Sequence, residues 1–307
     1  GSARRVLLTV SGTIAEGLAD DVAAGRRPRV DYLELANAFS ADLADYASCA
    51  DSSGMAGRVG ALLGKALGAN ARLAWTCWRA RRSYDVIVTD GEQVGLPLAA
   101  MLWWSRRSTA ARHVMIVHIM SRRNKALLFR WLRLGRHIDQ LLVYSSAQQR
   151  FIVDQLHVAP AKVTVTPFMV DSRFFDPAVV ASSRDERVVC AAGLEFRDYK
   201  TMLAAVAGLD VPVVLAAASP WSKRSDGLDG IDIPANTSVV RLDLHALRQL
   251  YADSAVVVMP LQESEFQAGI TTILEGMSMG KPVVCTRTTG QTDTIVDGVN
   301  GRYVSVG

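Results

Sequence analysis

Short runs of β-branched and aliphatic residues alternate with longer helical stretches along the whole chain, and this alternation limits the possible folds most strongly. A chain that repeats strand and helix in this order forms a parallel sheet covered by helices. The pattern therefore predicts an α/β protein with two doubly wound, Rossmann-like domains. The expected strands of the first are Val6–Val10, Val30–Ala36, Tyr84–Thr89, His113–Ile119, Gln140–Tyr144 and Lys162–Thr166. Those of the second are Arg187–Ala192, Val211–Ala217, Ser238–Leu242, Ala255–Pro260 and Pro282–Thr286.

The length of 307 residues fits two domains better than one, because single cores rarely grow beyond about 250–300 residues. A polar segment that contains Pro177 and runs from Asp176 to Glu186 is typical of an interdomain linker. We expect a first domain over residues 1–178, a linker over 179–186 and a second domain over 187–307. In doubly wound sheets, ligands bind beyond the carboxyl ends of the strands. The site should therefore lie where two such edges face a cleft.

Composition is typical of a globular protein from a reducing compartment. Half of the residues are hydrophobic (50%) and 21% are charged, which is enough apolar material for large cores. The four cysteines lie far apart and lack the paired spacing of zinc sites or disulfide frameworks. No apolar run reaches the roughly 18–20 residues that cross a bilayer. We expect a cytoplasmic protein, either soluble or associated with the inner face of a membrane.

Charge is divided unevenly along the chain. Residues 1–178 hold 23 Lys and Arg against 15 Asp and Glu, whereas the remainder holds 11 against 15. A basic first domain favours an anionic partner, such as a phospholipid surface or a phosphorylated acceptor. Basic residues interleaved with stacking aromatics are missing, so nucleic acid is not expected as a partner.

The segment Ser121–Arg136 reads as a helix with one apolar and one basic side. The apolar side comprises Leu127, Leu128, Trp131 and Leu134, and the basic side Arg123, Arg130, Arg133 and Arg136. The preferred interpretation is a helix that packs its apolar side on the sheet. The alternative is an interfacial helix that attracts anionic lipid. Trp103–Arg107 is a second patch with the same ambiguity, and Glu92 is either a solvated loop acid or a group that faces the acceptor.

The stretch Met259–Val284 carries the most specific pattern, Glu-Phe-Gln-Ala-Gly-Ile-Thr-Thr-Ile-Leu-Glu-Gly followed by Gly-Lys-Pro-Val-Val. It resembles the donor-site signature of retaining glycosyltransferases of the GT-B fold, the family 4-like group. In that signature, two acidic residues separated by seven others flank a helix start. Glu275 matches the second acid, whereas Gln267 stands in place of the first.

Other segments resemble the same family in the same order. His118 ends a strand where the family places a histidine at the cleft. Further resemblance lies in Lys162–Asp171, Phe175–Pro177, Gly193–Thr201 and Asp297–Gly301. Besides Gln267, two features depart from the family: Leu194–Glu195 replaces an arginine after the loop glycine, and Ser11–Thr13 is a reduced form of the glycine-rich turn.

The resemblance implies transfer of a sugar from a nucleoside diphosphate sugar to an acceptor hydroxyl, with retention and without a metal or cofactor. The base is not resolved between UDP, GDP and ADP, and the acceptor is a lipid-linked molecule, a polysaccharide or a small molecule. Unpaired amides that open the helix after Gly269 suit a diphosphate. The expected donor-binding residues are Gly12, Gly193, Arg197, Lys223, Ala268, Gly269, Ile270, Thr271, Thr272 and Glu275. The expected catalytic residues are His118, Arg197, Lys223, Gln267 and Glu275.

Within this set, Arg197 and Lys223 would bind the phosphates and Glu275 the ribose hydroxyls, while Gln267 and His118 would contact the sugar. Each residue also has a plainer interpretation: a structural histidine, a solvated acid, surface cations, or glycines that serve turns alone. Two other functions stay open, a nucleotide-sugar epimerase or hydrolase of the same fold and a non-catalytic nucleotide-binding protein. A dinucleotide dehydrogenase is disfavoured, because Ser11–Ile14 lacks the Gly-x-Gly-x-x-Gly fingerprint.

Overall fold

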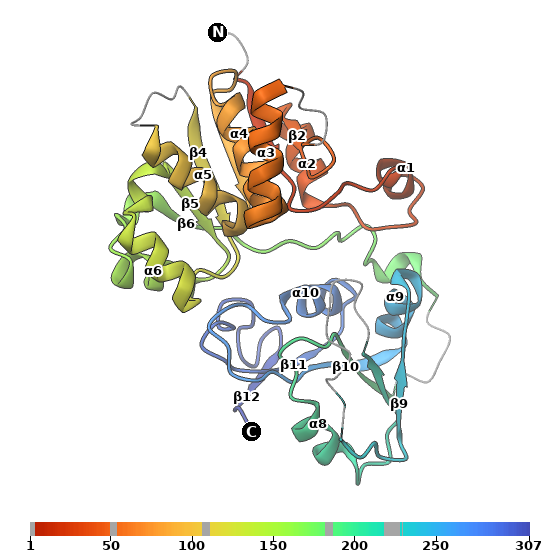
Figure 1. The fold of residues 1–307 in the computed structure, drawn as a ribbon. Helices are drawn as coiled ribbons and strands as arrows, with labels where there is room; N and C mark the ends of the chain where they lie inside the picture. The colour runs from red at the N-terminus through yellow and green to blue at the C-terminus, as the bar shows by residue number, and fades with distance from the viewer. Residues whose placement is uncertain (1–3, 50–53, 106–110, 182–186, 218–227, 229) are drawn as a thin grey trace. The chain divides into compact units, whose positions relative to one another are not determined.

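The computed structural model describes residues 4–49, 54–105, 111–181, 187–217, 228 and 230–307. The chain divides into two compact units (Figure 1). Unit 1 comprises Gly1–Asp20 and Arg29–Pro167, and unit 2 comprises Asp21–Pro28 and Phe168–Gly307. The linker expected over residues 179–186 thus falls in unit 2, and residues 182–186 lie outside the described part of the chain.

Unit 1 is built on a six-stranded parallel sheet with the order β2-β1-β3-β4-β5-β6. Its strands are β1 Val6–Thr9, β2 Asp42–Ala44, β3 Val86–Asp90, β4 Arg112–Val117, β5 Gln140–Val143 and β6 Val163–Val165. Its α-helices are α1 Leu18–Ala23, which continues into the part assigned to unit 2, α2 Asp31–Phe39, α3 Gly54–Leu67, α4 Ala69–Ala80, α5 Glu92–Trp104, α6 Arg123–Trp131 and α7 Ser146–Arg150. Shorter helical turns are Leu134–His137, Phe151–Gln155 and Pro160–Lys162.

Unit 2 repeats this architecture with the strand order β12-β11-β10-β7-β8-β9, again all parallel. Its strands are β7 Val188–Ala192, β8 Val213–Ala216, β9 Thr237–Val240, β10 Ser254–Met259, β11 Val283–Thr286 and β12 Arg302–Val304. Its helices are a 3-10 turn Pro177–Val179 and the α-helices α8 Tyr199–Val206, α9 Leu244–Ala252 and α10 Ile270–Ser278. In both units, every strand runs parallel to its neighbours. The chain therefore crosses over the sheet between successive strands, as the alternating sequence pattern predicts.

The predicted strands are present within one or two residues at each end, except one. Val30–Ala36 is not a strand: Val30 is the extended residue before α2, whose first turn contains Asp31 and Glu34. Acidic side chains in a first turn favour a helix start, and here this preference outweighed the strand preference of the apolar residues. The sequence analysis missed two strands of three residues each, β2 and β12.

Helix α10 packs closely on β10, and this contact fixes the position of the helix. A Cβ added to Gly276 would lie 2.9 Å from a side-chain carbon of Val257, so only glycine permits this approach. Val257 and Ile273 are both fully buried in the core of the unit. The start of α10 is therefore held rigidly at the carboxyl ends of the strands.

Within the described residues, every helix is too short or too polar to span a membrane.

Candidate functional site

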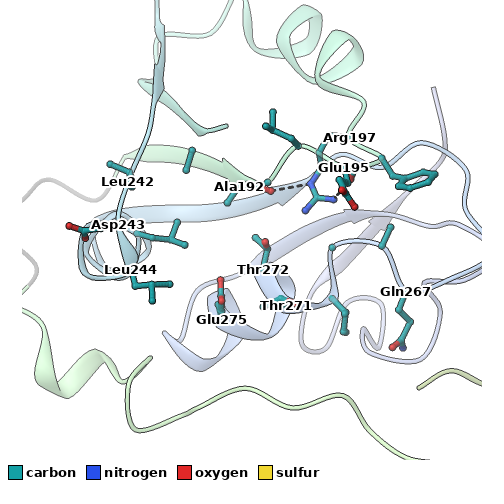
Figure 2. Close-up of a pocket in the computed structure, with 18 of the residues that line it drawn as sticks. Ala192, Glu195, Arg197, Leu242, Asp243, Leu244, Gln267, Thr271, Thr272 and Glu275 are labelled. Atoms are coloured by element: carbon teal, nitrogen blue, oxygen red, sulfur yellow. Dashed lines mark hydrogen bonds between the residues drawn. The ribbon is translucent and has the colours of Figure 1, made fainter. Parts of the chain in front are cut away.

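A pocket of about 700 Å³ opens at the carboxyl ends of the unit 2 strands (Figure 2). This volume suits an organic ligand of nucleotide-sugar size. Most of its lining comes from three places: the loop after β7, the start of α9, and α10 with the loop before it. Among the residues that line it are Ala192, Gly193, Glu195, Arg197, Leu242, Asp243, Leu244, Leu247, Gln267, Ala268, Gly269, Ile270, Thr271, Thr272 and Glu275.

The start of α10 presents backbone N–H groups to this pocket. Gly269 precedes the helix in the left-handed conformation (φ 73°) and provides no side-chain cap. The first intrahelical hydrogen bond runs from the Ile273 N–H to the Gly269 carbonyl. The N–H groups of the first turn point out of such a helix and carry the positive end of its dipole. The helix start predicted after Gly269 is confirmed. Its first amide is not unpaired, because the Ile270 N–H donates to the Gln267 carbonyl over 3.4 Å.

The guanidinium of Arg197 lies beside this helix start. Arg197 Nε donates to the Ala192 carbonyl over 3.0 Å and Nη1 to the Glu195 carbonyl over 2.7 Å. A Cβ built on Gly269 would lie 3.4 Å from Nη1, and one on Gly193 would lie 2.5 Å from Nη2. Burial lowers the pKa of Arg197, which is 9% exposed, but from a value so high that the group keeps its charge. The positive charge of Arg197 and the positive end of the α10 dipole therefore lie in the same part of the pocket.

Glu275 lies in the second turn of α10, and its carboxyl group is buried at the pocket wall. The Tyr251 hydroxyl donates to Glu275 Oε2 over 2.8 Å. Burial raises the pKa of Glu275 to about 7, against a smaller lowering by the Tyr251 hydrogen bond. Burial also raises the pKa of Tyr251, so its hydroxyl remains a donor. Thr272, one turn earlier, lines the pocket on the same side of α10 (Figure 2).

Gln267 lies on the loop before α10, apart from Glu275 (Figure 2). The spacing of eight residues between Gln267 and Glu275 is therefore not two turns of one helix, because the helix begins at Ile270. Gln267 Oε1 is buried and has no hydrogen-bond partner among the described residues. An amide oxygen in this state is costly unless a ligand hydroxyl pairs with it.

The other predicted site residues divide into three groups. Lys223 lies outside the described residues, so its role as a phosphate ligand is a prediction. Gly12 and His118 belong to unit 1 and do not line this pocket, whereas Gly193 and Ala268 do.

Several residues that line the pocket or support its wall carry no clear signal in the sequence. Tyr251 occupies an apolar position of α9 and resembles an ordinary core aromatic. Leu242, Leu244 and Leu247 form an apolar wall, a function that their spacing alone does not reveal. Arg27, in the segment Asp21–Pro28 that belongs to unit 2, also lines the pocket. The segment lies far away in sequence, so only tertiary structure brings it here.

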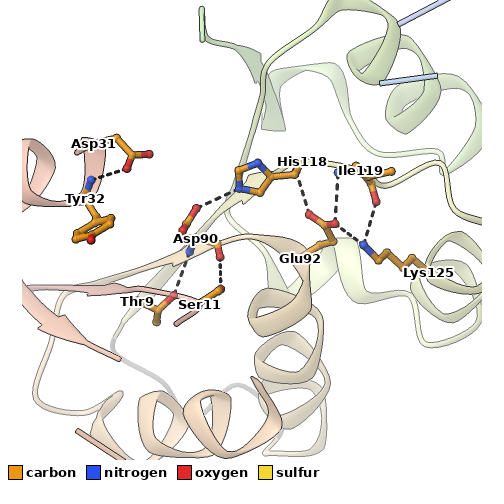
Figure 3. A network of polar contacts seen from close by, with 9 residues as sticks. All are labelled: Thr9, Ser11, Asp31, Tyr32, Asp90, Glu92, His118, Ile119 and Lys125. Atoms are coloured by element: carbon orange, nitrogen blue, oxygen red, sulfur yellow. Dashed lines mark hydrogen bonds and ion pairs between the residues drawn. The ribbon is translucent and has the colours of Figure 1, made fainter. Parts of the chain in front are cut away.

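A second polar cluster lies at the carboxyl ends of the unit 1 strands (Figure 3). His118, just after β4, donates from Nε2 to Asp90 Oδ1 over 3.1 Å, and Asp90 ends β3. The backbone of Asp90 is held by Thr9, whose hydroxyl accepts from its N–H over 3.0 Å. Burial lowers the pKa of His118, but the hydrogen bond and charge of Asp90, with smaller contributions from Glu92 and Asp31, outweigh it and raise the pKa.

Glu92 is part of the scaffold of this cluster. Its carboxylate is 2% exposed, pairs with Lys125, and accepts the backbone N–H groups of His118 and Ile119. Neither sequence interpretation of Glu92, a solvated acid or an acceptor-facing group, is correct, because a buried ion pair with these partners fixes the loop after β4.

Comparison with known proteins agrees with this geometry. Residues 187–307 match the model of the family described as glycosyl transferases group 1. No curated protein sequence matches the chain.

Solved structures with a similar fold include a glycosyltransferase and two proteins with a bound nucleotide. Anabaena HepE in complex with UDP has a TM-score of 0.66 at 16% identity, covering 99% of this chain and 86% of that one. A glycosyltransferase from Rickettsia africae has a TM-score of 0.62 at 13% identity, covering 100% and 85%. The catalytic domain of Arabidopsis thaliana starch synthase IV, bound to ADP and acarbose, has a TM-score of 0.59 at 11% identity, covering 97% and 86%.

The two parallel six-stranded sheets with their helices confirm the predicted α/β architecture of the GT-B type. The family match over unit 2, together with this architecture, supports a transferase enzyme of the glycosyltransferase class.

Proposed function

We propose that the chain transfers a sugar from a nucleoside diphosphate sugar to an acceptor hydroxyl, with retention of anomeric configuration. One observation carries this proposal: the Arg197 guanidinium and the open first turn of α10 meet in the pocket whose wall contains the buried Glu275. Two phosphates require converging positive charge, and a ribose requires an acceptor for its hydroxyls. The bound UDP of HepE and the bound ADP of starch synthase IV support a nucleotide ligand for this fold.

The ligand would lie in the pocket as follows. The diphosphate contacts the N–H groups around Thr271 and the Arg197 guanidinium, and Glu275 accepts from the ribose. The leucines of the apolar wall cover the base, which remains open between uracil, guanine and adenine. The transferred sugar lies near Gln267, whose buried amide oxygen accepts one of its hydroxyl hydrogens.

The chemistry that suits these residues uses no protein nucleophile. The bond between the anomeric carbon and the departing phosphate oxygen breaks, and that oxygen takes the proton of the acceptor hydroxyl as the new bond forms on the same face. Arg197 and the helix start stabilise the negative charge that grows on the diphosphate. We propose that they do so without a divalent metal, and that His118 takes part in the transfer.

Titration calorimetry against UDP, GDP, ADP and NAD, in EDTA and again with Mg²⁺, tests the donor site. We expect one nucleoside diphosphate to bind equally well in both buffers. Arg197→Met should weaken it by about 10–100-fold, because a charge-assisted contact is lost. Lys200→Met is the matched control, since Lys200 is exposed and outside the pocket. Binding of NAD with no nucleoside diphosphate would overturn the proposal.

Product analysis tests the reaction. Proton NMR of the first product formed from an α-linked donor should show an α-linked sugar, and β-linked product would exclude retention. His118→Asn should lower turnover while leaving nucleotide affinity within about twofold. Rearrangement of the donor sugar with no transfer to any acceptor would favour an epimerase.

A further inference from the structure

Helix α6 of unit 1 packs on its core through one side only. Phe129 is 2% exposed and belongs to the core cluster of β4 and β5, against which Ala126 and Leu132 also pack. After the helix ends, Leu134 is fully buried in the same cluster. The sequence interpretation in which Leu127, Leu128 and Trp131 pack on the sheet is therefore wrong, because Phe129 and Leu134 fill that position.

The opposite side of α6 is apolar and exposed. Leu127 is 55% exposed, Leu128 42% and Trp131 82%. Leu127 and Trp131 each lie two residues from Phe129, which places them about 200° around the helix axis from it. They lie one turn apart and form an outward apolar strip with Leu128. A tryptophan so exposed beside two leucines is unusual for a surface that faces only water.

Basic side chains border this strip. Between Ile119 and Ile138 the chain contains six Lys and Arg and no Asp or Glu. Lys125 is bound to Glu92, whereas Arg122, Arg130, Arg133 and Arg136 are exposed and form no ion pair with a described residue. The surface is thus apolar at its centre and positive at its border.

A second helix of unit 1, α3, has the same design. Its buried side consists of Gly57 and Gly60, and Met55 and Leu62, two turns apart, are 84% and 66% exposed. Arg58 and Lys65, also two turns apart, are exposed beside them. Two helices of one unit therefore turn apolar side chains outward next to cations.

We propose that unit 1 docks on the surface of an anionic phospholipid bilayer through α6, with Leu127 and Trp131 at headgroup depth and the arginines against phosphate groups. Apolar insertion combined with positive charge is the chemistry of an interfacial helix. A second copy of the chain fits this surface poorly, because a two-fold contact would bring Arg130 and Arg133 of both copies together. Neutral apolar partners would leave the arginines desolvated and unpaired.

Flotation of the full chain with liposomes tests this docking. We expect binding to phosphatidylcholine vesicles that contain about a third phosphatidylglycerol, little binding to pure phosphatidylcholine, and loss at 1 M salt because the charges are screened. The variant Leu127→Ser/Trp131→Ser should bind at least about tenfold less, as should Arg130→Glu/Arg133→Glu. Val299→Ser removes an 80% exposed apolar side chain from unit 2 and should bind like the parent chain.

Three further measurements make the result decisive. Tryptophan quenching by brominated lipid should fall in Trp131→Phe if Trp131 enters the bilayer. Circular dichroism and nucleotide binding of the variants show that unit 1 is folded and that the donor site is intact, so the docking and the proposed function succeed or fail separately. Vesicle binding that the paired variants leave unchanged would overturn the proposal. So would a dimer that dissociates in Leu127→Ser/Trp131→Ser without any affinity for anionic vesicles.

Discussion

The Tyr251 hydroxyl donates to Glu275 Oε2 over 2.8 Å, and this bond joins α9 to α10 at the wall of the unit 2 pocket. Tyr251 is fully buried and Glu275 is 8% exposed. Because the tyrosine supplies only one hydrogen bond to a buried carboxyl group, burial dominates and the pKa of Glu275 rises to about 7. Glu275 thus changes its charge near neutral pH. In the proposed complex, its carboxyl group is the one that the ribose hydroxyls contact.

Replacement of Glu275 separates ligand binding from folding. Glu275→Gln keeps an oxygen for the Tyr251 hydroxyl but loses the negative charge, so nucleotide affinity at pH 8 should fall by about 10–100-fold with little loss of stability. Glu275→Ala leaves the buried tyrosine hydroxyl without its partner and should destabilise the fold by about 1–3 kcal/mol. Calorimetric titration and urea unfolding measure the two effects.

The matched control is Glu265→Gln, an exposed acid near the same loop that does not line the pocket. It should change neither quantity. Unaltered nucleotide affinity in Glu275→Gln would show that Glu275 does not bind the ribose.

The titration of Glu275 should also appear in the pH dependence of stability. The native state keeps this proton up to about pH 7, whereas an unfolded glutamate releases it near 4.5. Between these values the native state binds more protons, so the free energy of unfolding falls as pH rises, by an amount on the order of 1–3 kcal/mol. Glu275→Gln should have a flatter curve than the parent chain from pH 5 to 8. Parallel curves would contradict the raised pKa.

Gly269 is expected to tolerate no side chain. Its φ of 73° is strained for alanine, and a Cβ would lie 2.5 Å from Met259 Sδ in the core. Gly280, at the other end of α10, has a similar φ of 69° with open space around it, so Gly280→Ala measures the backbone strain alone. We expect Gly269→Ala to cost about 1–3 kcal/mol more than Gly280→Ala in urea unfolding, and to weaken nucleotide binding. Equal losses of stability would show that Met259 moves aside without cost.

Asp90 should control the protonation of His118. In Asp90→Asn the hydrogen bond and charge that raise the pKa of His118 are weakened or lost, while burial continues to lower it. NMR titration of the His118 ring should therefore show a lower pKa than in the parent chain.

The raised pKa of His118 also makes stability depend on pH. The stabilisation by the His118–Asp90 pair is fully present below 6.5, the pKa of an unfolded histidine, and is lost as the pH rises through the higher pKa of the folded state. Asp90→Asn should remove this dependence, and Asp154→Asn, at an exposed site, should not. An unchanged His118 titration in Asp90→Asn would contradict the assignment.

The sequence by itself determined the α/β architecture, the position of nearly every strand and the helix start after Gly269. These features depend on local periodicity and on glycine, which are readable along the chain. Val30–Ala36 shows where this fails, since a short apolar run does not distinguish a strand from α2 until its neighbours are placed.

Tertiary structure decided how the chemical groups combine. The Tyr251–Glu275 bond and the burial that raises the Glu275 pKa, the Arg197 guanidinium beside Gly269, and the outward apolar strip of α6 all depend on which surfaces other elements cover. Burial and desolvation are properties of the packed molecule, so residue spacing alone does not predict which groups a side chain contacts or how far its pKa shifts.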